Sequence, residues 1–157
     1  MMADMTDKTA PVPAGFRTIT PYIAVKGGAA AIDYYRKAFG AEQVRRMDGP
    51  DGSVMHAELR IGDSLLQISD EFPTMGLRAP AGDGVTGSIL LYVPDVDTVF
   101  ARAVAEGATE ISAVEDSFSG DRIGTLLCPF GHRWAIATHI EDVSDEEIER
   151  RVAELYG

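Results

Sequence analysis

The sequence predicts an α+β protein in which two βαβββ modules form a curved mixed sheet around a cleft, followed by a C-terminal helix. The clearest strand signal is at residues 54–61, where apolar and polar side chains alternate as in a strand buried on one face. The order strand, helix, strand, strand, strand then occurs twice. Each helix ends at a similar glycine motif, A-F-G-A-E from Ala38 and A-E-G-A-T from Ala105. A repeated element order at this scale indicates two copies of one structural unit.

The first module is expected over residues 16–70, after a disordered lead-in at 1–15 that is polar and rich in Pro and Ala. Its helix carries apolar residues at helical spacing and stops at Gly40, a residue type that commonly ends helices. The expected strands and helix lie, in chain order, at 18–25, 29–39, 42–47, 54–61 and 64–69.

The second module is expected over residues 87–139, after a loop at 71–86 that serves as a linker or a lid. Its last two strands form a hairpin around residues 129–131, because Pro fixes φ and Gly permits a tight turn. The tail at 140–157 holds a helix that begins with a capping box, Ser-Asp-Glu-Glu. The expected elements lie at 87–93, 96–106, 110–114, 125–127, 134–138 and 144–155.

The chain is acidic, with a formal net charge of −11 from 14 Lys and Arg against 25 Asp and Glu. Phosphate binding needs concentrated cations, so we expect neither nucleic acid nor an anionic membrane as a partner. A single cysteine, Cys128, excludes an internal disulfide and a multi-cysteine metal site. No apolar stretch has the length of a membrane span, and the N-terminus lacks the pattern of a signal peptide. We therefore expect a cytoplasmic protein.

Several motifs together carry a family resemblance. They are T-P-Y-I-A-V from Thr20, A-I-D-Y-Y-R-K-A-F-G-A-E from Ala31, H-A-E-L-R-I-G-D-S from His56, G-D-R-x-G-T-x-x-x-P-F-G-H-R-W from Gly120 and T-H-I-E-D-V-S from Thr138. The paired modules with these motifs resemble the vicinal oxygen chelate superfamily, which includes glyoxalase I, extradiol dioxygenases, fosfomycin-resistance enzymes and bleomycin-binding proteins. The likeness is strongest to its PhnB-like glyoxalase and bleomycin-resistance branch. The resemblance implies the fold and a homodimer, but this fold hosts many reactions.

The resemblance also implies positions for a metal. In the superfamily a divalent cation acts as a Lewis acid on vicinal substrate oxygens, and its ligands come from the first and last strands of each module. The corresponding positions here are Thr20, Gln67, Ser88 and Ala135. None is His, Asp or Glu, and hydroxyl and methyl groups do not complete a tight divalent site. We therefore expect no cofactor, while a divalent metal held elsewhere stays open.

His56, Glu58 and Arg60 occupy the polar face of the alternating strand. If that face lines the cleft, as the parity of Thr20 and Gln67 indicates, His56 and Glu58 are a candidate catalytic acid–base pair, because a His beside a carboxylate can act as a general base or bind a ligand. The alternative is a structural ladder of hydrogen bonds or a salt-bridged rim on an exposed sheet.

Further positions are candidate ligand contacts. Tyr22 and Tyr92 offer flat walls with hydroxyl tips, and Arg122 in the G-D-R motif could hold an anion with both arms of its guanidinium. The alternative for Arg122 is an ion pair with Glu115 or Asp116. The candidate ligand contacts are Thr20, Tyr22, Gln67, Ser88, Tyr92 and Arg122.

The remaining polar and aromatic candidates favour structural roles. His132 and Arg133 serve the hairpin turn or solvent, and His139 pairs with the acidic residues that follow it. Trp134 packs into the core. Cys128 stands where the PhnB-like branch has Asp, and it is expected to be a small buried apolar residue.

Three functions stay open. The first is binding of a small aromatic or drug-like molecule in a metal-free cleft. The second is a glyoxalase-like lyase or isomerase, or a dioxygenase relative, that uses His56 and Glu58. The third is an accessory homodimer with a vestigial cleft. An open cavity would separate the first from the third, and loss of turnover in His56→Ala would identify the second.

Overall fold

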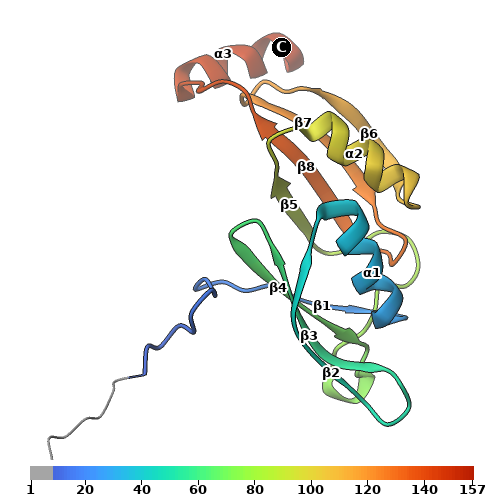
Figure 1. The fold of residues 1–157 in the computed structure, drawn as a ribbon. Coiled ribbons are helices and arrows are strands. Elements are labelled where there is room, and N and C mark those ends of the chain that lie inside the picture. Colours follow the sequence, from blue (N-terminus) through green and yellow to red (C-terminus); the bar gives the residue numbers. More distant parts are fainter. Residues whose placement is uncertain (1–8) are drawn as a thin grey trace, which may run out of the picture.

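The computed structural model describes residues 9–157, so the part of the predicted lead-in at 1–8 lies outside the described residues. The α+β class is confirmed, and the βαβββ order occurs twice before a C-terminal helix (Figure 1). The first module contains β1 (Tyr22–Val25), α1 (Gly28–Phe39), β2 (Glu42–Asp48), β3 (Val54–Ile61) and β4 (Ser64–Asp70). After a 3-10 turn, η1 (Pro73–Met75), the second contains β5 (Ser88–Tyr92), α2 (Val96–Ala105), β6 (Thr109–Asp116), β7 (Asp121–Leu127) and β8 (Arg133–His139); α3 (Asp145–Tyr156) follows.

Each module builds its own four-stranded mixed sheet, with strand orders β1-β4-β3-β2 and β5-β8-β7-β6. In both sheets the first strand of the module pairs in parallel with the last strand, and the other neighbours are antiparallel. The curved sheet predicted from the sequence is therefore two sheets of the same topology.

Strand register decides which side chains share a face. Tyr22 lies opposite Gln67, and Gln67 lies opposite Glu58, so all three point to the same side of the first sheet. In the second sheet Ala135 lies opposite both Leu90 and Thr125. The other face of each sheet is apolar and carries the helix of its module.

One hydrophobic core joins the two modules. The helices α1 and α2 lie on the same side of the molecule and pack against each other (Figure 1). Trp134 of β8 is 1% exposed, and its ring centroid lies 4.8 Å from that of Phe39 and 5.3 Å from that of Tyr35, both in α1. The core position predicted for Trp134 is confirmed, and this cluster links the helix of one module to the sheet of the other.

The first strand is shorter than predicted, because β1 begins at Tyr22 rather than at residue 18. Pro21 has no N–H to donate to a ladder, and the hydroxyl of Thr20 donates to the carbonyl of Arg17 at 3.0 Å, which closes a local turn. Thr20 therefore lies before the sheet. Conversely, β7 begins earlier than predicted, at Asp121, so most of the G-D-R motif is part of the strand.

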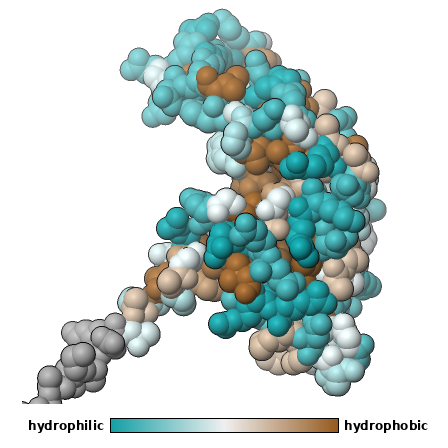
Figure 2. Space-filling view, viewed as in Figure 1, coloured by the Kyte–Doolittle hydropathy of each residue, from teal (hydrophilic) through white to brown (hydrophobic). Residues whose placement is uncertain are grey.

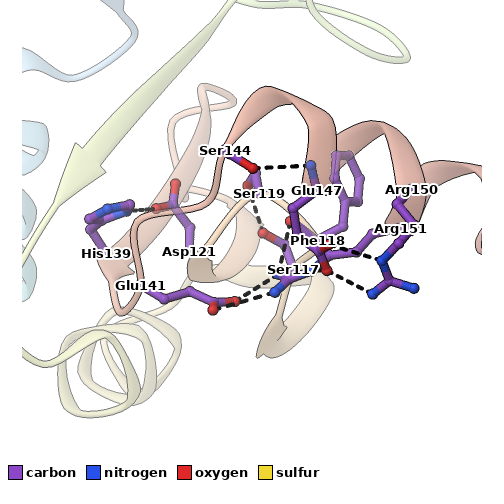
Figure 3. Close-up of polar contacts among 10 residues, drawn as sticks. All are labelled: Ser117, Phe118, Ser119, Asp121, His139, Glu141, Ser144, Glu147, Arg150 and Arg151. Atoms are coloured by element: carbon purple, nitrogen blue, oxygen red, sulfur yellow. Dashed lines mark hydrogen bonds and ion pairs between the residues drawn. The ribbon is translucent and has the colours of Figure 1, made fainter.

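The last helix, α3, begins at the predicted cap, where Ser144 accepts a 3.2 Å hydrogen bond from the amide of Glu147 (Figure 3). The capping box predicted that the carboxylate of Glu147 reaches back to the amide of Ser144. Instead, this carboxylate accepts a hydrogen bond from Arg151 at 3.0 Å. Arg151 also donates to the carbonyl of Phe118, which ties α3 to the β6–β7 loop. Across residues 9–157, none of the helices combines the length and the apolar composition that crossing a membrane requires.

Candidate functional site

The open faces of the two sheets, opposite the helices, carry large apolar side chains. Met47 is 54% exposed, Leu90 48% and Tyr92 55%. Figure 2 shows that the surface is hollowed between the two modules and that apolar residues gather at the base of the hollow. Because side chains of this size are normally buried, a concave apolar surface is a candidate binding region.

The first polar cluster on this side is a chain of three side chains from β1 and β3. Tyr22 Oη lies 3.3 Å from His56 Nδ1, and His56 Nε2 lies 3.3 Å from Glu58 Oε2. With Glu58 ionised and the His56 ring neutral, Nε2 donates to Glu58 and Nδ1 accepts from the hydroxyl of Tyr22. Glu58 is 7% exposed and is also 3.8 Å from Arg45 on β2. These hydrogen bonds orient the hydroxyl of Tyr22, whose oxygen can still accept a hydrogen bond from a ligand.

The second polar cluster spans the end of the other sheet. Tyr92 Oη donates to Asp121 Oδ2 at 2.8 Å, and Asp121 Oδ1 lies 2.7 Å from Nδ1 of His139. His139 Nε2 lies 2.7 Å from Asp142, so both ring nitrogens face carboxylates (Figure 3 shows Asp121 with His139). Those two contacts raise the pKa of His139 above its ordinary value, Asp121 contributing more than Asp142. The Asp121 carboxylate also raises the pKa of Tyr92.

Sequence reasoning found only part of this second cluster. It paired His139 with the acidic residues after it, and the contact with Asp142 agrees. It missed Asp121, although the signal was present. The turn at 129–131 closes with the amide of Cys128 donating to the carbonyl of His132, and counting outward from that pair places Asp121 opposite His139.

Arg122 lies on the opposite face from the other candidate ligand contacts. Its cross-strand partner on β8 is Thr138, whose hydroxyl accepts a hydrogen bond from the amide of Val96 in the first turn of α2. The guanidinium of Arg122 donates to both oxygens of Asp97 in α2 at 2.8 Å and to Asp116 at 3.0 Å. The ion-pair alternative is therefore the observed one for Asp116, and the prediction that Arg122 reaches a ligand in the cleft is not supported.

The four positions that the resemblance assigns to a metal do not fit a divalent cation. Thr20 lies outside the sheet, and Ala135 offers a methyl group. The Ser88 hydroxyl accepts from Arg133 at 2.6 Å. Gln67 supplies one amide oxygen, a weak ligand by itself. Within residues 9–157, no three His, Cys, Asp or Glu side chains lie together in a way that could hold a metal ion.

An apolar groove with a volume of about 560 Å³ runs between the modules, beside the β3–β4 turn and β5. Leu66, Leu90 and Val99 line it, together with the almost fully buried Trp134. Tyr92 adds a hydroxyl group that is already held by the second polar cluster. Small-molecule sites typically have volumes of roughly 300–1,000 Å³, apolar walls and few polar groups. The groove has the size and the lining of such a site.

A second cavity, of about 490 Å³, lies at the start of β5 beneath the loop between the modules. Tyr22 and Ser88 line it, so the structure brings two predicted ligand contacts together there, while Tyr92 lines the groove. The two cavities share Pro21 and Ile89. Three predicted contacts line neither of them: Thr20, Gln67 and Arg122.

Two side chains from the hairpin have structural roles. His132 Nε2 lies 2.7 Å from the carbonyl oxygen of Ala24, so His132 joins the hairpin to β1 rather than serving only its own turn. Cys128 is 3% exposed and lies 3.2 Å from the hydroxyl of Tyr35, which agrees with its predicted burial.

The repeated βαβββ module, with its two sheets of the same topology, is the feature that defines the class of fold. The model of the Glyoxalase/Bleomycin resistance protein/Dioxygenase superfamily matches residues 16–136. The chain belongs to this superfamily, as its motifs predicted. The uncharacterized protein Mb0911c of Mycobacterium bovis is 38% identical over 135 residues, which cover 83% of this chain and 89% of that protein.

Solved structures share the fold at lower identity. The PhnB protein from Bacillus cereus has a TM-score of 0.60 and 18% identity, covering 78% of this chain and 99% of its own. TnmS3, an antibiotic binding protein from Streptomyces sp. CB03234, has a TM-score of 0.59 and 21% identity, covering 76% of this chain and 93% of its own. These similarities confirm the PhnB likeness at the level of the fold.

Proposed function

We propose that this protein binds a small, largely apolar or aromatic molecule in the groove between its two modules, and that binding requires no metal. The observation that carries the proposal is the groove itself, which has a volume of about 560 Å³ and mostly apolar walls. Burying apolar ligand surface there supplies about 25 cal/mol per Å². The open groove also argues against the third hypothesis, an accessory protein with a vestigial cleft.

The donor chemistry supports the metal-free part of the proposal. The positions that would hold the superfamily's cation carry hydroxyl, amide and methyl groups, so Lewis-acid chemistry has no built site at these positions. A shared fold with an antibiotic binding protein is compatible with a binding role, although the fold alone does not specify a ligand.

Binding of the neutral apolar dye Nile red tests the proposal. We expect saturable fluorescence enhancement that is unchanged by EDTA. Leu90→Glu, which places a charge in the groove wall, should weaken binding at least about tenfold, because burying an unpaired carboxylate is costly. Leu155→Glu is the matched control, since Leu155 of α3 is 62% exposed, lies outside the apolar face of the open side and lines neither cavity. Loss of binding in EDTA, or equal binding by both variants, would contradict the proposal.

A second candidate is an enzyme, a glyoxalase-like lyase or isomerase. The hydrogen-bonded chain from Tyr22 through His56 to Glu58 favours it, because a carboxylate behind an imidazole increases the basicity of the distal nitrogen. Turnover of thiol adducts of 2-oxoaldehydes by the wild type would support this candidate, provided that His56→Ala and Glu58→Gln abolish it. Glu42→Gln, a change at an exposed carboxylate of β2, should leave turnover unaffected. No turnover by the wild type would remove this candidate.

The proposal keeps the homodimer and the cytoplasmic location predicted from the sequence. The exposed apolar side chains of Met47, Leu90 and Tyr92 support a partner of the same kind, because an apolar face of this extent is normally covered. Light scattering coupled to size exclusion should give twice the chain mass of 16.9 kDa. A monomer at micromolar concentration would reject the dimer without affecting the binding proposal.

A further inference from the structure

We propose that the smaller cavity, at the start of β5, is a binding site for the carboxylate or phosphate group of a small organic anion, held by Arg78 and Arg133. This site is distinct from the apolar groove. Its argument depends on charge and hydrogen-bond donors, so it does not rest on the ligand proposed for the groove.

The cavity is cationic in a chain whose net charge is −11. Arg78, His132 and Arg133 line it, and none of the described lining residues is Asp or Glu. The ion pairs found among residues 9–157 use other arginines. Two guanidinium groups at one cavity without a carboxylate partner create a local field that favours an anion.

Arg133 is held at the cavity by its neighbour. Its Nη1 donates to the Ser88 hydroxyl at 2.6 Å, which restricts the guanidinium without neutralising its charge. A guanidinium has five N–H donors, so one such bond leaves a planar fork available for two oxygens of a carboxylate or phosphate. Arg78, on the exposed loop after η1, supplies the second positive charge.

The loop above the cavity adds backbone donors. Residues 84–87 line it, and their amides form no hydrogen bond within the described part of the chain. Successive free N–H groups in a glycine-containing loop are suited to anion oxygens. His132, which also lines the cavity, is held in place because its Nε2 lies within hydrogen-bond distance of the carbonyl oxygen of Ala24.

The volume indicates an organic anion rather than a bare ion. About 490 Å³ exceeds what phosphate alone would fill, and Tyr22, Val85 and Ile89 give the cavity apolar walls. The ligand class that fits is an aromatic or aliphatic acid, or a phosphate ester of similar size.

Calorimetric titrations of the full-length protein with benzoate, phenyl phosphate and neutral benzamide test the site and distinguish carboxylate from phosphate. At least one anion should bind at least about tenfold more tightly than benzamide, and its affinity should fall as salt rises. In the Arg78→Gln/Arg133→Gln double variant, affinity for that anion should fall about tenfold or more. Arg36→Gln, which removes one charge from an exposed position of α1, is the matched control and should bind as the wild type does.

Equal binding of benzamide and the anions would overturn the site, as would failure of both anions to bind or an unchanged affinity in the double variant. If the double variant does not fold, Arg78→Gln alone tests the site, because Arg78 lies on an exposed loop. This single variant should lower the affinity for the anion severalfold. Nile red binding should be unchanged in Arg78→Gln, so failure of the anion site and failure of the groove are separate results.

Discussion

The phenolic oxygen of Tyr92 donates a 2.8 Å hydrogen bond to Asp121 and thereby ties the edge strand β5 to β7 across the intervening strand β8. Asp121 is 9% exposed, and its other oxygen contacts His139. A nearly buried carboxylate is thus satisfied from two strands, at the end of the groove where Tyr92 forms part of the wall.

Tyr92→Phe should lower the free energy of unfolding by about 1 kcal/mol, because it removes one donor from a nearly buried acceptor and keeps the ring. Urea denaturation measures this change. Nile red affinity should stay within about twofold of the wild type, since the apolar wall is preserved. A variant as stable as the wild type would mean that water replaces the phenol at Asp121.

Protonation of His139 should stabilise the fold at acidic to neutral pH. Its pKa is raised in the folded protein by Asp121 and then Asp142, so the folded state holds the proton more tightly than the unfolded state. The stabilisation is fully present below the unfolded pKa of about 6.5 and is lost as pH rises through the raised folded pKa. The stability difference between the wild type and His139→Gln should therefore be larger at about pH 5.5 than at pH 9. A difference independent of pH, with the His139 resonances titrating at an ordinary pKa by NMR, would reject this linkage.

Trp134→Ala should destabilise the protein by about 3–5 kcal/mol, because it removes a large buried side chain and leaves a cavity against Tyr35 and Phe39. Since this cluster joins the two modules, the wild type should unfold in one cooperative transition by both circular dichroism and tryptophan fluorescence. Tyr156→Ala, at a residue that is 80% exposed, is the control and should change stability by less than about 0.5 kcal/mol. Two separated transitions in the wild type would show that the modules fold independently.

Arg122→Gln should leave binding in both cavities unchanged, because the guanidinium lies on the α2 side of the sheet and contacts Asp97. Its cost in stability should be small, because solvent screens an exposed ion pair. Nile red and anion titrations, with thermal unfolding, check both statements. Weaker ligand binding in a folded variant would return Arg122 to the list of ligand contacts.

Most of the fold could be predicted because its signals are local. The alternation along β3 and the glycines after each helix depend on neighbours in sequence, and they place most boundaries within a few residues. The start of the first strand was predicted too early, because the Thr20 hydroxyl donates to the carbonyl of Arg17 and Pro21 has no N–H for the sheet. Strand periodicity does not reveal these contacts.

The candidate site was predicted less completely, because it depends on which sheet face a residue occupies. His56 and Glu58 were placed together correctly, since residues two apart on one strand share a face. Arg122 was a candidate ligand contact with an ion pair as the alternative, and its face could not be read from the sequence, because the expected boundary at residue 125 left it outside β7, which begins at Asp121. A shift of one residue along a strand moves a side chain to the opposite face of the sheet.

By itself, the sequence determined the α+β class, the repeated βαβββ order and membership of the superfamily, because periodicity, turn residues and motifs are properties of contiguous segments. Only the tertiary structure decided where the cavities lie and what lines them. Arg78 and Arg133 come from separate segments and meet at one cavity only after the loop between the modules folds over β5. The groove likewise exists only because the core around Trp134 holds the two sheets with their edge strands apart.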